Sequence, residues 1–228
     1  MFADGANLEE MRINRGNPLV SGFTTNPTLM RNSQISNYLE FASLATKIAE
    51  PLPISFEVFA DDSTNMISQA KKLSALGENI FVKLPVTFTN GKLTNDVAQK
   101  LNQDGVKLNI TAIMTIAQVK GYLTSLDPSI SNIFSIFAGR IADTGVDPAP
   151  IVKHCKNLII DYPNWNILWA SPREILNLRQ AENVGCDIIT MTQDLWKKLP
   201  LQGKDLNLYS KETVLMFYND AIKSNFYV

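Results

Sequence analysis

The chain has 228 residues, of which 45% are hydrophobic and 19% are charged, and its formal net charge is −1. These values are typical of a soluble globular protein, with no basic stripe for nucleic acid and no apolar run long enough to span a membrane. Met1–Gly5 has no signal-peptide pattern, and Cys155 and Cys186 have no metal-binding spacing, so we expect a reduced, cytoplasmic protein. His154, the only histidine, is expected at the surface, which argues against a serine–histidine triad or a histidine-rich zinc site.

Short apolar runs alternate with longer amphipathic stretches along the whole chain. Eight runs have the length and composition of buried strands: Phe2–Asp4, Leu19–Thr24, Ile54–Val58, Ile80–Leu84, Lys107–Thr111, Asn132–Phe137, Trp165–Ala170 and Asp187–Met191. Eight strands that alternate with helices predict an α/β fold, a (β/α)8 TIM barrel, in preference to an open sheet. No Gly-x-Gly-x-x-Gly turn follows the first strand, which weakens a dinucleotide-binding alternative.

Apolar residues between the strands recur at the spacing of amphipathic helices, over Leu39–Ile48, Met66–Leu76, Val97–Leu101 and Ile151–Ile159. No internal repeat, linker or low-complexity tract indicates a second domain. We therefore expect residues 1–228 to form one TIM-barrel domain.

The sequence continues beyond the eighth strand. Thr192 is expected to cap a short helix, and Ser210 to cap a terminal helix over Lys211–Lys223. The barrel is thus expected to end near residue 198, with residues 199–228 as a C-terminal helical extension.

Lys83 lies within the apolar run Ile80–Leu84, where a charged side chain is unusual. If Val82 and Leu84 face the helices, strand alternation directs Lys83 into the barrel. Burial disfavours the ammonium form, and a neutral amine can form a Schiff base with a carbonyl substrate. The alternative is an edge-strand lysine that extends its amine to water, but an inward position favours the chemical role.

Polar residues lie at or near the carboxyl ends of six other strands, the face on which barrel enzymes carry out chemistry. They are Asp4, Asn26, Glu57, Asn109, Thr111, Ser135, Arg140, Ser171 and Arg173. Asp4 and Glu57 are carboxylates suited to proton transfer. Asn26, Asn109 and Ser135 are suited to binding substrate hydroxyls. Arg140 and Arg173, with Ser171, have the character of a phosphate clamp.

Each of these residues also has a simpler explanation when taken alone. Asp4 can cap the helix that follows it, Asn26 can belong only to a turn, and Glu57 can be half of an ion pair. Arg140 can pair with Asp143 nearby in the chain. Their common position at strand ends favours a shared site.

Five segments resemble the transaldolase family, whose small members include fructose-6-phosphate aldolase. They are Phe2–Asp4, Gly22–Thr28, Val82–Thr87, Phe137–Ile141 and Ala170–Arg173. The resemblance implies class I aldol chemistry on sugar phosphates in an α/β barrel, with no metal or cofactor. It makes Lys83 the Schiff-base lysine and adds Thr24 and Phe137 to the expected substrate-binding residues.

The residues Glu57, Thr111 and Met114 are similar to the transaldolase side of this family, in which a glutamate and a threonine position the catalytic water. The small aldolases typically carry glutamine and, three residues beyond the threonine position, tyrosine. The spacing of Ser171–Arg173 also resembles transaldolases, although the short chain and the glycine after Asp4 do not. We expect a transaldolase that transfers a dihydroxyacetone unit. A fructose-6-phosphate aldolase and a non-catalytic sugar-phosphate-binding barrel are the alternatives.

Relatives of similar size form rings of subunits, so the resemblance implies a homo-oligomer. The terminal helix carries Val214, Leu215, Phe217 and Tyr218, which can dock on a neighbouring subunit. The alternative is that this helix packs on its own barrel.

Overall fold

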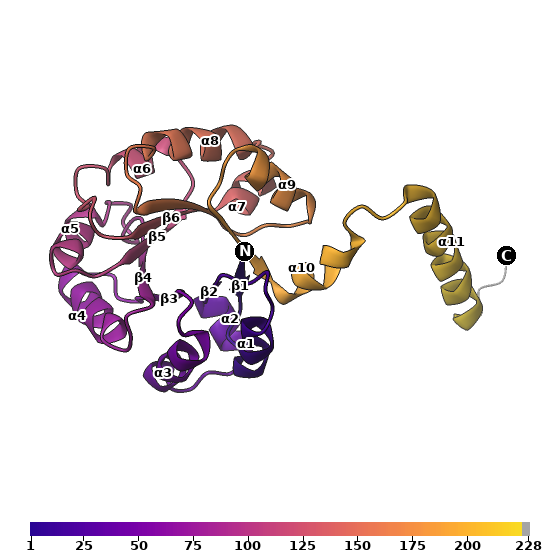
Figure 1. Cartoon of the computed structure of the whole chain (residues 1–228), viewed down its shortest axis with the longest axis horizontal. Helices are drawn as coiled ribbons and strands as arrows, with labels where there is room; N and C mark the ends of the chain where they lie inside the picture. The colour runs from indigo at the N-terminus through magenta and orange to yellow at the C-terminus, as the bar shows by residue number, and fades with distance from the viewer. Residues whose placement is uncertain (225–228) are drawn as a thin grey trace.

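A computed structural model describes residues 1–224, in which eight parallel strands close into a barrel surrounded by helices (Figure 1). The strands pair in chain order, and β8 closes the barrel against β1. Their bounds are β1 Phe2–Asp4, β2 Gly22–Thr24, β3 Ile54–Glu57, β4 Ile80–Pro85, β5 Leu108–Ile113, β6 Asn132–Ile136, β7 Trp165–Trp169 and β8 Ile188–Thr192. The TIM-barrel prediction is confirmed, and every expected run overlaps a strand, although β4, β5 and β8 extend one or two residues beyond their runs.

Each strand is followed by at least one helix. The helices are α1 Leu8–Arg15, α2 Pro27–Asn32, α3 Tyr38–Ala49, α4 Ser63–Ser74, α5 Asn95–Gln103, α6 Ile116–Lys120, α7 Ala138–Asp143, α8 Ala149–Leu158, α9 Leu176–Asn183, α10 Gln193–Lys198 and α11 Leu206–Lys223, with a 3-10 turn at Leu199–Leu201. Asn7, Asn37 and Asp62 accept backbone hydrogen bonds in the first turns of α1, α3 and α4. Asn7 rather than Asp4 caps α1, which leaves the Asp4 carboxylate for other contacts.

The apolar core has two parts. The larger lies between the barrel and the helices and includes Val82 and Leu84, both completely buried. The smaller alternates along the strands with the first and therefore fills the barrel interior; its members are Phe2, Ile133, Leu168 and Ala170, with Phe81, Phe137 and Ile188 packed against them. Lys83, between Val82 and Leu84, faces this interior as expected.

Gly22 makes room for the Phe2 ring inside the barrel. The two residues are partners in the β1–β2 register, and a Cβ on Gly22 would lie 2.5 Å from ring carbons of Phe2. β2 is also shorter than the expected run Leu19–Thr24, since its strand begins only at Gly22.

The chain beyond the barrel differs from the sequence-based expectation. α10 follows Thr192 as expected, although in the described part of the chain the Thr192 hydroxyl makes no capping hydrogen bond. α11 begins at Leu206 rather than Lys211, because Asp205 accepts a hydrogen bond from the Leu208 amide. The expected cap, Ser210, lies inside the helix. Residues 225–228 of the expected extension lie outside the described residues.

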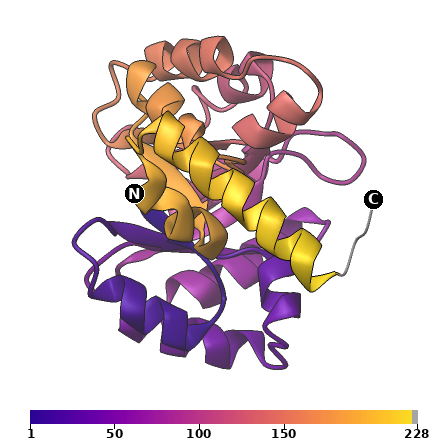
Figure 2. The ribbon, with the colours of Figure 1, turned by 90° about the vertical axis from the view of Figure 1, so that its right-hand side faces the viewer.

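α11 stands away from the barrel at the end of a connecting segment (Figure 1), and Figure 2 shows its full length from the side. None of its residues is buried. The alternative in which this helix packs on its own barrel is therefore wrong. Over residues 1–224, no helix combines the length and apolar character needed to cross a membrane. His154, on α8, is exposed as expected.

Candidate active site

Lys83 lies in the middle of β4, inside the barrel, and is only 6% exposed. Its Nζ donates a hydrogen bond of 2.7 Å to the Thr25 carbonyl oxygen and lies 3.4 Å from Oε2 of Glu57. A closed barrel leaves no edge strand, so the alternative of an edge lysine reaching water is wrong. The amine is held at the carboxyl end of β2 and β3 by one carbonyl and one carboxylate.

Glu57 ends β3 and is the register partner of Lys83 on β4. It is thus half of an ion pair, as the simpler explanation held, but its partner is the interior lysine. The hydroxyl of Tyr38, at the start of α3, donates a 2.8 Å hydrogen bond to the Glu57 carbonyl oxygen. The Tyr38 ring packs on Phe59 at 4.8 Å between centroids, and burial raises the pKa of Tyr38. Tyr38 therefore ties α3 to the end of the strand that carries Glu57.

Asp4 ends β1 and accepts hydrogen bonds from two residues of the β2 end, Thr24 Oγ1 at 2.7 Å and Asn26 Nδ2 at 3.3 Å. Desolvation by burial raises the pKa of Asp4, and the charge of Lys83 and these two hydrogen bonds oppose that rise. Asn26 is more than a turn residue, because its Oδ1 also accepts from the Leu29 amide and caps α2. The carboxylate is thereby fixed by neutral donors within the field of the lysine.

A second set of hydrogen bonds crosses the barrel interior from β3 to β6. Asn109 Nδ2 donates to Ser55 Oγ at 3.1 Å, and Ser135 Oγ donates to Asn109 Oδ1 at 2.6 Å. Asn109 is the register partner of Lys83, so this set lies next to the amine. Thr111, on the same side of β5 two residues further on, is 1% exposed, and its Oγ1 has no hydrogen-bond partner among the described residues.

The two expected phosphate-binding arginines lie at the rim. Arg140, on α7, is exposed and its guanidinium lies 5.9 Å from the centre of the Phe137 ring. Asp143 pairs with Arg173 instead of Arg140, so the simpler explanation offered for Arg140 is wrong. The Arg173 amide also donates a 2.7 Å hydrogen bond to Asn177 Oδ1 at the start of α9.

Ser171 and Gly139 fix how the β7–α9 segment meets α7. Ser171 has a φ of +59°, a left-handed conformation that is uncommon for a residue other than glycine. A Cβ on Gly139 would lie 1.6 Å from the Ser171 carbonyl oxygen and 3.2 Å from Nε of Arg173. Only glycine lets Ser171 and Arg173 approach the first turn of α7 this closely.

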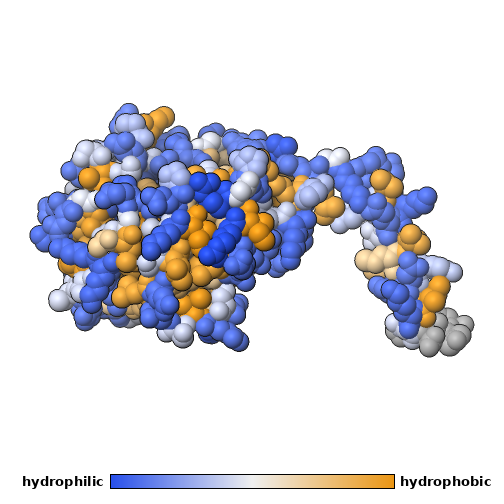
Figure 3. All heavy atoms as spheres, turned by 60° about the horizontal axis from the view of Figure 1, so that its bottom comes forward, coloured by the Kyte–Doolittle hydropathy of each residue, from blue (hydrophilic) through white to orange (hydrophobic). Residues whose placement is uncertain are grey.

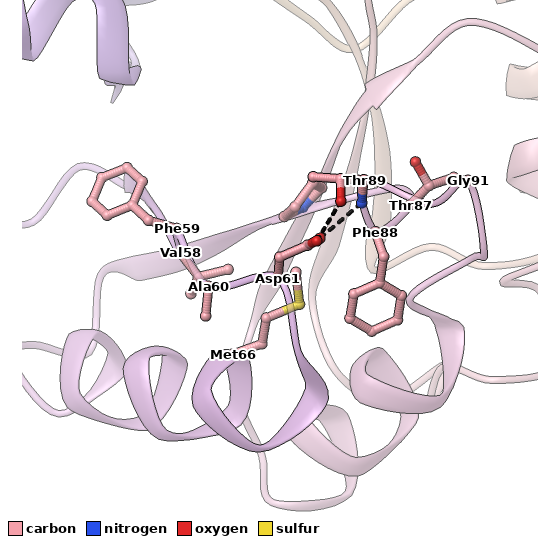
Figure 4. A pocket seen from close by; sticks show the side chains of 10 residues that line it. Val58, Phe59, Ala60, Asp61, Met66, Thr87, Phe88, Thr89 and Gly91 are labelled. Carbon is pink, nitrogen blue, oxygen red and sulfur yellow. Dashed lines mark hydrogen bonds between the residues drawn. The ribbon is translucent and has the colours of Figure 1, made fainter.

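A hollow lies beside the ends of β3 and β4, lined by residues of the two following loops (Figure 4). Asp61 accepts hydrogen bonds from both the amide and the hydroxyl of Thr89, which joins these loops and lowers the pKa of Asp61. Phe59, Phe88 and Met66 give the hollow an apolar wall. Neither Glu57 nor Lys83 lines it, so it is separate from the interior polar contacts.

Every site residue expected from the sequence lies in one of two groups, an interior group and a rim group. The interior group is Asp4, Thr24, Asn26, Glu57, Lys83, Asn109, Thr111 and Ser135, and the rim group is Phe137, Arg140, Ser171 and Arg173. Thr24, expected to bind substrate, is 3% exposed and its hydroxyl is bonded to Asp4.

Sequence analysis missed Ser55, Thr190 and Tyr38. Ser55 is two residues before Glu57, and Thr190 lies in the eighth run, so alternation alone places both on the interior side. Nothing in the local sequence around Tyr38 indicates its bond to the Glu57 carbonyl.

These features define a TIM barrel with an amine, carboxylates and amides gathered inside its mouth. The sequence profile described as Transaldolase/Fructose-6-phosphate aldolase matches residues 1–226. The chain belongs to this family.

Similar proteins include a "Probable transaldolase" of Thermoanaerobacter sp., 32% identical over 191 residues, which cover 83% of this chain and 84% of that protein. Another "Probable transaldolase", of Thermoplasma volcanium, is 31% identical over 202 residues, 87% of this chain and 86% of that protein.

Among solved structures, CdNal from Clostridium difficile in complex with mannosamine has a TM-score of 0.59 at 12% identity, covering 98% of this chain and 82% of that one. The 4-hydroxy-tetrahydrodipicolinate synthase of Methylacidiphilum fumariolicum has a TM-score of 0.58 at 12% identity, with coverages of 89% and 73%. At this identity the likeness concerns the fold alone.

Proposed function

We propose that this protein is a class I transaldolase, which moves a dihydroxyacetone unit from a ketose phosphate to an aldose phosphate through a Schiff base on Lys83. The observation that carries the proposal is the buried Lys83 amine, 3.4 Å from the Glu57 carboxylate, in a chain of this family. The reaction requires no metal or cofactor, since the imine itself is the electron sink.

Schiff-base formation involves Lys83 and its β3 and β5 neighbours. The amine attacks C2 of a ketose phosphate such as fructose 6-phosphate, and the carbinolamine then loses water to give the imine. Glu57 shuttles the protons through a water held by Thr111. The buried, unpartnered Thr111 hydroxyl in the described chain supports this role, because its side chain retains hydrogen-bonding capacity.

Carbon–carbon cleavage follows at Asp4. Its carboxylate takes the C4 hydroxyl proton, the C3–C4 bond breaks, and the electron pair moves into the imine to form an enamine. An aldose phosphate leaves, and a three-carbon unit remains on Lys83. Asn26, Asn109 and Ser135 hold its hydroxyls until the enamine carbon attacks an acceptor aldehyde, after which hydrolysis of the imine frees Lys83.

The acceptor phosphate is assigned to Arg140, Ser171 and Arg173 at the rim. Guanidinium groups match phosphate oxygens through paired N–H donors. A phosphate bound there competes with Asp143 for Arg173, so Asp143 holds the guanidinium in place when the site is free.

Mass spectrometry of borohydride-treated protein with fructose 6-phosphate tests the mechanism. We expect one reduced three-carbon adduct on Lys83 in the wild type and none in Lys83→Ala. The adduct should disappear when an acceptor aldehyde is added before the borohydride. The control is Lys92→Ala, because the Lys92 side chain is 69% exposed at the surface. An adduct that persists in Lys83→Ala would identify another amine as the nucleophile. Ligand binding without any adduct would favour the non-catalytic barrel.

Fructose-6-phosphate aldolase activity is the nearer alternative, in which free dihydroxyacetone is released. Glu57 argues against it, because the small aldolases typically carry glutamine at that position. An assay with dihydroxyacetone and glyceraldehyde 3-phosphate discriminates the two, since a transaldolase accepts the three-carbon unit from a ketose donor. Rapid formation of fructose 6-phosphate from the free ketone would favour the aldolase.

We further propose a homo-oligomer working in the reduced cytoplasm, with residues 1–198 as its barrel and 199–228 as an extension of the same domain. Hydrophobic side chains lie along α11 (Figure 3), and Leu215 and Phe217 are 56% and 64% exposed. Such an apolar helix surface favours contact with a second copy. Light scattering should therefore give a multiple of the 25.4 kDa chain mass, which falls on substitution of Leu215 and Phe217 by serine.

A further inference from the structure

Thr190, on β8, is a polar residue of the barrel interior without a role in the chemistry proposed above. It is 5% exposed, and its Oγ1 lies 2.5 Å from Oγ1 of Thr24. Thr24 in turn donates to Asp4 Oδ1 at 2.7 Å. Three successive strands around the closure of the barrel, β8, β1 and β2, are thus connected through two hydroxyls and one carboxylate.

The number of available protons sets the direction of these hydrogen bonds. A hydroxyl has one proton to donate, and an ionised carboxylate can only accept. When Asp4 is ionised, the single Thr24 proton points to Asp4, so the Thr190 proton must point to Thr24. Both hydroxyls are buried, and the distance between them would allow either one to donate, so the proton count alone fixes this direction.

We propose that Thr190 is a positioning residue, which acts through Thr24 to commit Oδ1 of Asp4 to an internal hydrogen bond and leave Oδ2 for the substrate hydroxyl. The inference rests on the proposed role of Asp4 as the base for C–C cleavage. Among the described residues, Oδ2 has only the longer 3.3 Å contact with Asn26, so it is the oxygen with free capacity. Successive hydrogen bonds polarise one another, so Thr190 strengthens the Thr24–Asp4 bond without touching Asp4.

The charged groups around Asp4 determine how far the Thr190–Thr24–Asp4 hydrogen bonds must counteract the effect of burial on the pKa of Asp4. Burial raises the pKa of Asp4, and Lys83 from β4 is the cation that acts against this rise. Glu57 from β3 pairs with that cation, while β2 and β8 contribute the neutral groups Thr24 and Thr190. Loss of the Thr190 hydroxyl is therefore expected to raise the pKa of Asp4 further and to shift base catalysis to higher pH.

The test compares Thr190→Val, Thr24→Val, the double variant and Thr190→Ser by carbon-13 NMR titration of labelled aspartate, with the Asp4 signal assigned by Asp4→Asn. Thr190→Val should raise the Asp4 midpoint by about 0.1–0.7 on the pH scale, which corresponds to a 10–30% weakening of a charge-assisted hydrogen bond. The acidic limb of kcat/KM for fructose 6-phosphate cleavage should move with it. Thr190→Ser should restore both values.

The double variant separates positioning from packing. If Thr190 acts only through Thr24, Thr190→Val has no further effect on the Asp4 midpoint in the Thr24→Val background. Thr46→Val, which removes a buried hydroxyl bonded to the Ala42 carbonyl on α3, is the control and should leave the midpoint unchanged. Additive effects, or an unchanged midpoint in Thr190→Val, would overturn the inference. A shifted midpoint with normal cleavage in Asp4→Asn would instead overturn the role of Asp4 and leave the hydrogen-bond chain intact.

Discussion

Gly139→Ala should damage the rim of the site by a displacement that the structure specifies. The new Cβ would lie 1.6 Å from the Ser171 carbonyl oxygen, whereas real Cβ atoms essentially never come closer than 3.0 Å to another heavy atom. The two segments must therefore move apart by at least the difference, 1.4 Å in total. Ser171 already has a left-handed backbone, so its segment has little freedom to adjust without further strain.

This displacement should appear in both stability and catalysis. Overpacking costs about 1–3 kcal/mol, which lowers the Tm of a chain of this size by about 2–4 °C per kcal/mol. A misplacement on the order of 1 Å costs about 100-fold in rate. We therefore expect kcat/KM to fall about 100-fold with glyceraldehyde 3-phosphate as acceptor and much less with unphosphorylated glyceraldehyde.

The measurements are thermal unfolding and coupled transfer assays with the two acceptors. Gly16→Ala is the matched control, because a Cβ there would meet only the Ile13 carbonyl oxygen, at an ordinary 3.5 Å. An unchanged Tm together with unchanged discrimination between the two acceptors would refute the reasoning. Equal losses with both acceptors would show that Gly139 supports the whole site rather than the phosphate end.

Asp4→Asn should slow C–C cleavage by about 10²–10⁴-fold, the usual contribution of a general base. Because burial raises the pKa of Asp4 above 3.8, the folded state binds the Asp4 proton more tightly than the unfolded chain does. The free energy of unfolding therefore falls as the pH rises from the pKa of Asp4 in the unfolded chain to its pKa in the folded state. In urea unfolding at several pH values, the free energy of unfolding of Asp4→Asn should therefore increase relative to that of the wild type toward neutral pH. A difference that does not depend on pH would contradict this. Tyr38→Phe removes the hydroxyl that donates to the Glu57 carbonyl and should cost about 1–3 kcal/mol. The Tm should fall by about 2–4 °C per kcal/mol, and an unchanged Tm would argue against that cost. Arg173→Ala should raise KM about 10–100-fold for phosphorylated acceptors only, and equal effects on both acceptor types would remove Arg173 from the phosphate site.

The barrel and the inward direction of Lys83 were predictable because both depend on local patterns. Val82 and Leu84 flank the lysine with period-two spacing, and that alternation needs no knowledge of distant contacts. The same rule identifies Ser55 and Thr190 as interior residues, but a serine or threonine in a strand carries no charge that marks it as unusual. Interior polar residues of this kind become conspicuous only when their partners are known.

Other features depend on contacts far apart in the sequence. Tyr38 meets the Glu57 backbone through 19 residues of separation, and Arg173 selects Asp143 at a separation of 30 rather than leaving it to Arg140. The start of α11 differs from the expected one because Asp205 is as good a cap as Ser210, and Leu206–Tyr209 between them contains no glycine or proline that would exclude a helix. Neither the partner of Asp143 nor the start of α11 is determined by residue propensities alone.

Asn26 limits which residues this site can accept, because its side-chain amide must both accept one hydrogen bond and donate another. Its Oδ1 must accept from the Leu29 amide to begin α2, so its Nδ2 must face the Asp4 carboxylate. Aspartate or serine would begin the helix equally well, but aspartate would set a second negative charge against Asp4 and serine is too short to reach both partners. One residue thus determines both the start of α2 and the orientation of the Asp4 carboxylate. A substitution at this position that changes one of them also changes the other.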